Sequence, residues 1–208
     1  DTAEETVEEA APEVVETLDS PAVTTASTVK TGVGVTSDPC PEVIGGIPTG
    51  ADPSKGCIYL GLLNDYTGPF GPYGIPLETG QRGFWLWANQ SGGIGDYSVA
   101  LIEGYDTQYN PQKHLEGYKA IRGEVDALAM SLGTPQTQFI LDDMDADNMI
   151  AAPMSWYSGW SYKSSDRGLV VEFGAAYCAD GMNAVDWAMA NLPVDIKTIG
   201  VMGYAGDY

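Results

Sequence analysis

The chain has 208 residues, of which 29 are Asp or Glu and 9 are Lys or Arg, so its formal net charge is −20. A surface this negative repels phosphate backbones and anionic headgroups, which disfavours binding to nucleic acid and polybasic docking on a membrane. Hydrophobic residues make up 44% of the chain, enough for a sizeable core. The chain contains no run of 18 or more apolar residues, which is the length needed to span a bilayer.

Residues 1–38 differ in composition from the rest of the chain. DTAEETVEEAAPEVVETLDS holds eight acidic residues and no basic one, and small and hydroxylated residues follow it. Such a segment buries too little apolar surface to offset the entropy lost on ordering. We therefore expect a disordered acidic tether, with a short helix over 4–18 as the alternative because apolar residues recur there at helical spacing. Tethers of this kind often lead from a membrane anchor, which would lie upstream of Asp1.

Cys40 and Cys57 flank a loop rich in Pro and Gly, with no CxxC spacing and no histidine nearby. This pattern favours a disulfide closing a loop of roughly 16 residues over a zinc site, and two free thiols are the alternative. A disulfide would indicate an oxidising, extracytoplasmic location. Cys178 would then have no partner within the chain.

From residue 57 onward, short apolar runs alternate with helical patterns. Expected strands cover 57–63, 97–104, 126–132, 148–153, 168–174 and 197–203, and expected helices cover 80–90, 111–122, 134–144 and 183–191. This alternation predicts an α/β fold of three layers, a mostly parallel sheet with helices on both faces. Residues 64–74, NDYTGPFGPYG, are expected to form a loop of about ten residues before the first helix, a length typical of functional loops.

The residues after each expected strand are candidates for a binding site, because ligands of open α/β sheets bind beyond the carboxyl ends of the strands. Aromatic side chains there could wall an apolar pocket; they are Tyr66, Tyr73, Trp156, Tyr157 and Trp160. Polar groups near an expected helix start, which would favour a carboxylate, are Thr134, Gln136 and Thr137, and Ser155 adds a hydroxyl. The pattern predicts a small-molecule site, and the alternative is that the rings only cover a loop corner.

Catalytic and metal sites are not expected. His114, the one histidine, is predicted to be solvated on a surface helix and not at a strand end. Asp143, Asp145 and Asp147 resemble the start of a calcium loop, but Asn148 and Met154 stand where that loop needs Gly and Glu. The glycines at 68, 71 and 74 do not spell a dinucleotide motif. We expect no enzyme activity, no metal and no cofactor.

An ordered set of residues carries a family resemblance. It consists of Thr67-Gly68-Pro69, Tyr73-Gly74, Gly80, Asn89, Gly92-Gly93-Ile94, Gly95, Asp106, Pro111 and Ala120. In this order the set resembles the start of type 1 periplasmic substrate-binding proteins, above all the leucine/isoleucine/valine-binding and amide-binding receptors of ABC importers. GYAGDY at 203–208 resembles the strand end at which these proteins enter their second lobe. The resemblance covers roughly residues 57–208.

The resemblance implies two α/β lobes that close on a ligand. Residues 39–172 would form the ligand-binding lobe 1, and residues 173–208 a hinge crossing and the start of an incomplete lobe 2. Tyr73 would stack on the ligand, the loop over 134–137 would take a carboxylate, and Pro153 and Ser155 would offer a carbonyl and a hydroxyl. Pro135 removes an N–H donor and Trp156 is bulkier than the usual residue, which disfavours a standard aliphatic amino acid.

The function implied by the resemblance is an extracytoplasmic solute-binding receptor, periplasmic or held at the cell surface by a lipid anchor. It would capture a small polar metabolite, such as an amino acid or amide, for an ABC transporter whose permease is its membrane partner. The alternative is a ligand-sensing ectodomain or an interaction module with the same fold and no transport role.

Overall fold

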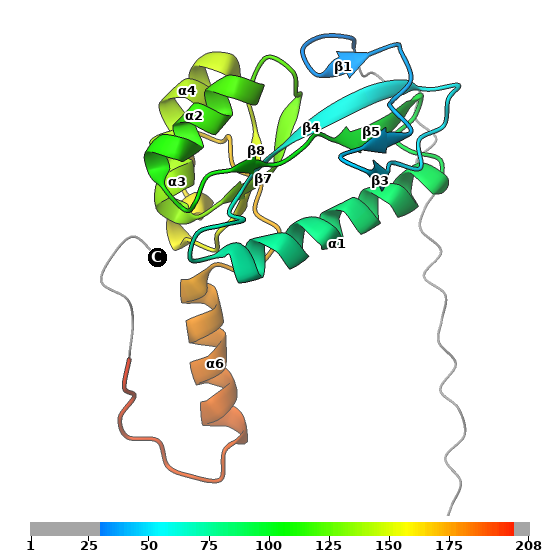
Figure 1. Ribbon diagram of the computed structural model, residues 1–208. Coiled ribbons are helices and arrows are strands. Elements are labelled where there is room, and N and C mark those ends of the chain that lie inside the picture. The colour runs from blue at the N-terminus through cyan, green and yellow to red at the C-terminus, as the bar shows by residue number, and fades with distance from the viewer. Residues whose placement is uncertain (1–29, 202–208) are drawn as a thin grey trace, which may run out of the picture.

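The computed structural model describes residues 30–201, which form a mostly parallel six-stranded sheet with helices around it (Figure 1). The central strand β4 (Gly56–Asn64) pairs in parallel with β5 (Tyr97–Leu101), β6 (Tyr105–Asp106) and β7 (Ala127–Leu132). Strand β8 (Ala151–Met154) extends the sheet in parallel beyond β7, and the short β1 (Val35–Thr36) pairs antiparallel with β4. Gly56 to Asn64 form a strand because the run is apolar and half of it faces each helical layer.

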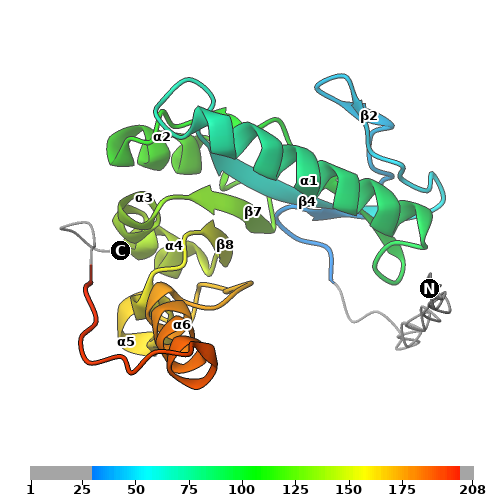
Figure 2. The ribbon, with the colours of Figure 1, turned by 90° about the horizontal axis from the view of Figure 1, so that it is seen from below.

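The helices lie on both faces of this sheet, as predicted. Helix α1 (Gly71–Gln90) runs along β4 on one face, and α2 (Pro111–Ile121), α3 (Thr134–Phe139) and α4 (Leu141–Asp147) gather on the other (Figure 2). Neighbouring side chains of β4 divide between the two layers. Leu63 packs with Tyr118 of α2, and Leu62 packs in the cluster that includes Trp85 of α1. The three-layer α/β prediction is therefore confirmed.

The first helix corrects our expectation for residues 64–74. It begins at Gly71, not at Gly80, with Pro72 in the first turn, where a backbone N–H needs no helical partner. A Cβ on Gly74 would lie 2.3 Å from the Oδ1 of Asn64, so this glycine allows α1 to pack closely on the end of β4. The segment is a short loop followed by a helix, and the prediction of a ten-residue loop is wrong.

The bounds of several other helices and strands also differ from those predicted. The expected helix over 134–144 is two helices, α3 and α4, which meet at Ile140. The helix expected at 183–191 starts earlier, as α6 (Tyr177–Asn191). The strand expected at 168–174 is reduced to one bridge between Val170 and Ala151, and residues 197–201 form no strand. The remaining elements are β2 (Val43–Ile44), β3 (Ile47–Pro48), a 3₁₀ helix η1 (Ser158–Ser161) and α5 (Lys163–Asp166).

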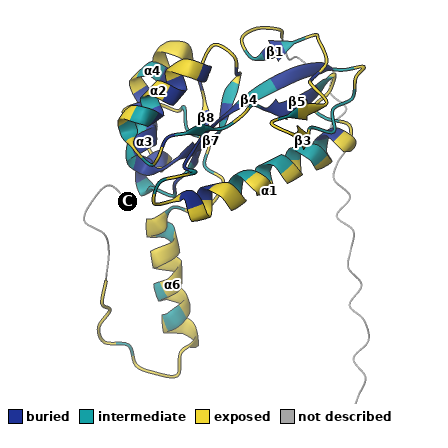
Figure 3. Ribbon diagram, in the orientation of Figure 1, coloured by how far each residue is buried: buried dark blue, intermediate teal, exposed yellow. Residues whose placement is uncertain are grey.

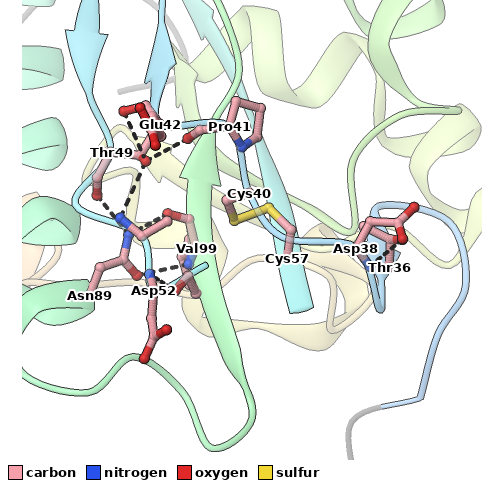
Figure 4. Close-up of a disulfide and its surroundings, with 12 residues drawn as sticks. Thr36, Asp38, Cys40, Pro41, Glu42, Thr49, Asp52, Cys57, Asn89 and Val99 are labelled. Atoms are coloured by element: carbon pink, nitrogen blue, oxygen red, sulfur yellow. Dashed lines mark hydrogen bonds between the residues drawn. A yellow bond between two sulfur atoms is a disulfide. The ribbon is translucent and has the colours of Figure 1, made fainter. Parts of the chain in front are cut away.

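The predicted disulfide is present and ties the β2–β3 hairpin region to the start of β4 (Figure 4). Cys40 and Cys57 are both buried, with their Cα atoms 4.7 Å apart. The same region is fastened from α1, where the Asn89 side-chain amide donates to the carbonyls of Thr49 and Val99, each at 2.8 Å. Cys178, on α6, is exposed as a free thiol.

Part of the segment that we expected to be a disordered tether belongs to the folded structure. Residues 1–29 lie outside the described residues, but residues 30–38 do not. Val35 is buried against Ile58 and Val99, and the Tyr59 amide donates to the carbonyl of Gly34 at 2.7 Å. A Cβ on Gly34 would lie 2.0 Å from the backbone nitrogen of Asp126. The boundary at residue 38 was therefore placed too late, because a two-residue strand is too short to give a sequence signal.

Helix α6 stands away from the sheet and its helical layers, and its surface is exposed along its length (Figure 3). None of its residues is buried. Its first turn is attached to the segment after β8, since the Tyr177 amide donates to the carbonyl of Trp156 at 2.9 Å. Within residues 30–201 we find no helix with the length and apolarity needed to cross a membrane.

Candidate functional site

A cavity of about 550 Å³ opens at the carboxyl end of the parallel strands. Its walls come from the segments that follow β4, β6, β7 and β8, and from the start of α6. They are Phe70, Tyr73, Pro76 and Leu77; Tyr109; Leu132, Gly133 and Thr134; Met154, Ser155 and Trp156; and Tyr177. This is the edge at which open α/β sheets bind ligands, and the volume is within the range of small-molecule sites.

One wall is built on two stacked rings. Phe70, just before α1, stacks on Tyr109 with ring centroids 4.0 Å apart and an interplanar angle of 25°. Tyr73, on the first turn of α1, is 6.1 Å from Phe70 and 65% exposed, so it forms the lip of the cavity. The pair joins two segments far apart in the sequence and presents mostly carbon to the cavity.

The second wall is built on Trp156. Its ring meets Phe173 edge-on at 5.4 Å, and Tyr177 of α6 lies 6.2 Å from it at a tilt of 56°. Because Tyr177 also donates its backbone N–H to the carbonyl of Trp156, the start of α6 is attached to the segment after β8 by both a hydrogen bond and a ring contact.

Two of the polar side chains that line the cavity form a pair. The hydroxyls of Thr134 and Ser155 are hydrogen-bonded to each other, and the indole N–H of Trp160 donates to the Ser155 oxygen at 3.1 Å. Both hydroxyl side chains are buried. They are therefore already engaged with the protein before any ligand arrives.

Four of the eight ligand-binding residues predicted from the sequence line this cavity, namely Tyr73, Thr134, Ser155 and Trp156. The other four do not. Tyr66 lines a separate cavity and donates its hydroxyl to Glu78; burial, and then this bond, raise the pKa of that hydroxyl. Pro153 is buried within β8. Position after a strand identified the right segments but not the direction of each side chain.

Thr137 is buried in the layer behind the cavity. Its hydroxyl lies 2.7 Å from that of Ser131 and 2.9 Å from the carbonyl of Gly133. These bonds hold α3 against the end of β7. Thr137 therefore positions the cavity wall from behind and does not line the cavity. Trp160 and Tyr157, also expected in the pocket, pack edge-on against each other at 5.4 Å.

Gln136 supports the stacked rings from behind. Its side-chain nitrogen donates to the carbonyl of Tyr109 at 2.7 Å. Gln108 and Tyr109 both have left-handed backbones, with φ of 51° and 52°, which for residues other than glycine is a strained conformation. The bond from Gln136 helps to hold that turn. Gly133 has φ of 103°, and a Cβ there would lie 2.1 Å from the Gln136 oxygen.

Three lining aromatics were missing from our prediction. Phe70 belongs to the GPFGPYG segment and Tyr109 to the segment after β6, so the strand-end rule could have found both. Tyr177 follows β8 only after η1 and α5, and no local signal marks it.

His114 is not solvated, and this prediction is wrong. It is fully buried on the inner face of α2, where its Nε2 lies 2.9 Å from the hydroxyl of Ser131. Burial lowers the pKa of its imidazole to about 3, so the ring is neutral at physiological pH. It does not line the cavity.

The acidic residues of α4 are engaged by cations. Asp147 accepts from the Tyr118 hydroxyl at 2.8 Å and from Arg122 at 3.1 Å. Asp142 and Asp145 both pair with Arg167. Across residues 30–201 no group of three possible metal ligands is found.

Comparison with known proteins identifies relatives of the chain. A family model described as periplasmic binding protein matches residues 57–208. A solved fatty acid ABC transporter substrate-binding protein from Thermomonospora curvata is 25% identical, with a TM-score of 0.56 over 76% of this chain and 36% of its own. No curated protein matches the chain.

Two further solved structures share the fold. A branched chain amino acid ABC transporter from Thermus thermophilus, solved with bound valine, is 13% identical, with a TM-score of 0.57 over 67% of this chain and 36% of its own. A possible leucine/isoleucine/valine-binding protein from Rhodopirellula baltica SH 1 is 18% identical, with a TM-score of 0.57 over 67% and 37%. The chain thus spans only 36–37% of the length of these three proteins.

Proposed function

The chain belongs to the periplasmic binding protein family, and from this premise we propose that it is an extracytoplasmic receptor that captures a small molecule for an ABC transporter. The observation that carries the proposal is the cavity of about 550 Å³ at the carboxyl edge of the sheet. Four strand-following segments converge there, which is the arrangement that parallel α/β sheets use for ligands.

The extracytoplasmic location is supported by the buried Cys40–Cys57 disulfide, since such bonds persist in oxidising compartments. The related solved proteins are substrate-binding proteins, and we propose capture without chemistry for this chain as well. Their named ligands differ, a fatty acid in one and valine in another. The ligand class therefore has to be argued from this chain's own cavity.

We assign the ligand-binding lobe to residues 39–172 together with β1, and the crossing toward a second lobe to residues 173–208. Domain closure around a ligand is a recurrent motion of two-lobed binding proteins. It would cover the cavity lip, where Tyr73 is now 65% exposed. A membrane permease is the partner we expect for the closed form.

A ligand screen with two matched variants tests this proposal. The purified chain is screened by thermal shift against amino acids, amides, ureas and small carboxylates, and compounds that raise Tm are titrated by calorimetry. Tyr73→Ala should weaken the affinity by about 1.5–3 kcal/mol because a buried ring contact is lost. Tyr162→Ala is the control, because Tyr162 is also 65% exposed but does not line the cavity. Equal effects of the two variants, or no ligand in a screen that also includes uncharged aromatic compounds, would argue against a receptor.

A further inference from the structure

We infer that the part of the ligand held by this cavity is an uncharged aromatic ring system. This rests on the proposed function and goes beyond it, because the sequence led us to expect a small polar metabolite. The first observation is the charge of the walls. None of the described residues that line the cavity is acidic or basic, although the chain as a whole has a net charge of −20.

An α-amino acid fits such walls poorly. It carries an ammonium and a carboxylate, and burying either charge without a partner is strongly unfavourable. The Thr134 and Ser155 hydroxyls, with the Trp160 N–H bonded to Ser155, leave a single O–H to donate outward, because one of the two hydroxyl protons lies between them. One donor from this pair suits a carbonyl or ether oxygen. The pair by itself does not balance a carboxylate, and the tyrosine hydroxyls and the Trp156 indole that also line the cavity are neutral groups.

The short helix α3 adds little for an anion. It has six residues, and Pro135 in its first turn has no N–H. The Thr137 amide is already bonded to the carbonyl of Gly133 at 3.0 Å. The anion contact expected from the sequence at this helix start is thereby weakened.

The rings supply the positive case. Five aromatic residues contribute to the walls, and aromatic pairs prefer offset-stacked or edge-to-face geometry, which gives attraction beyond simple burial of area. The Phe70–Tyr109 stack is fixed in advance by Gln136, whose amide holds the backbone of Tyr109. Trp156 is likewise braced by Phe173 and Tyr177. A flat ring can enter between these walls with little reorganisation.

A quaternary ammonium is the competing occupant, since aromatic cages bind such cations. It needs ring faces turned toward the cation, whereas Phe70 and Tyr109 turn faces toward each other at 4.0 Å. A cavity of about 550 Å³ is also large for one small cation. The geometry favours a ring system.

The test compares acetophenone with cyclohexyl methyl ketone, its saturated counterpart with the same carbonyl. Both are titrated calorimetrically into the full chain, beside valine and choline. We expect acetophenone to bind roughly 3- to 10-fold more tightly than the saturated ketone. Trp156→Phe should keep this ratio and Trp156→Leu should bring it close to one, with circular dichroism confirming that both variants fold.

Each other outcome is decisive. Equal affinity for the two ketones would show plain hydrophobic binding and overturn the inference. Valine or choline binding without either ketone would also overturn it, while leaving the receptor function intact. No binding of any of the four probes overturns the inference; if the wider screen is empty as well, the proposed function fails with it.

Discussion

Replacing His114 by glutamine should change how stability depends on pH. The imidazole is fully buried, its neighbour is the neutral hydroxyl of Ser131, and burial holds its pKa near 3, against 6.5 for the free side chain. Between these two values the unfolded chain binds a proton that the folded chain does not. The contribution of His114 to stability is therefore complete above pH 6.5 and is lost as the pH falls toward 3.

The magnitude follows from the width of that window. Each pH unit within it costs about 1.4 kcal/mol for one proton, so lowering the pH from 6.5 to 4.5 should remove about 2–3 kcal/mol of unfolding free energy. Glutamine keeps a hydrogen-bonding group near Ser131 but does not titrate. The wild type and His114→Gln have the same carboxylates. The large acid dependence that these carboxylates cause therefore cancels in the difference between the two free energies.

The assay is urea unfolding followed by tryptophan fluorescence, at pH values between 7.5 and 4.5. The wild-type free energy should fall relative to that of His114→Gln by about 2–3 kcal/mol across the window. A difference that stays constant to within about 0.5 kcal/mol would refute a buried neutral imidazole, because an exposed histidine has nearly the same pKa in both states.

Two further results are expected. Replacing both Cys40 and Cys57 by alanine should lower the unfolding free energy by about 3 kcal/mol in urea melts, since a loop of roughly 16 residues is no longer closed in the unfolded chain; an unchanged midpoint would contradict this. Gly133→Ala should lower Tm and weaken ligand binding in thermal-shift titrations, because its φ of 103° and the nearby Gln136 oxygen leave no room for a Cβ. Gly123→Ala, where a Cβ would meet no atom within 4 Å, is the control, and equal losses in the two variants would contradict the explanation from the backbone conformation and close packing of Gly133.

The central strands and the three layers could be predicted because their signal is local. Apolar runs predicted β4 and β7 to within one residue at each end and the start of β5, which ends three residues before the expected 104, and Pro111 marked the start of α2. The early start of α1 was missed because Gly71 and Gly74 look like loop residues. Their smallness instead serves contacts with Tyr66, Asn64 and Asp65 that exist only in the folded chain.

The candidate site, like the fold, could be predicted from the sequence only in part. Parallel strands place their following segments at one edge, so Tyr73, Thr134, Ser155 and Trp156 were found from position alone. Which side of a segment faces the cavity depends on packing that the sequence does not state, and Gln136 and Thr137 therefore turned out to lie behind the wall. His114 was different, since it shares a helix face with Tyr118 and Ile121, a periodic signal that neighbouring charges obscured.

The central place of β4 also determines how the chain must fold. Leu60 pairs with Ala127 and Leu63 with Ser131, so one edge of β4 gains its partner only after α1, β5 and α2 lie between them in the sequence. Contacts between such distant residues form slowly, because the loop entropy is lost before the strand pairing compensates it. Until β7 pairs with β4, Leu62 and Leu63, which are both fully buried in the native state, belong to an unpaired strand edge. The Cys40–Cys57 bond closes only the loop that leads from residue 40 to the start of β4. It therefore does not shorten the time for which the unpaired edge of β4 is exposed and prone to aggregation.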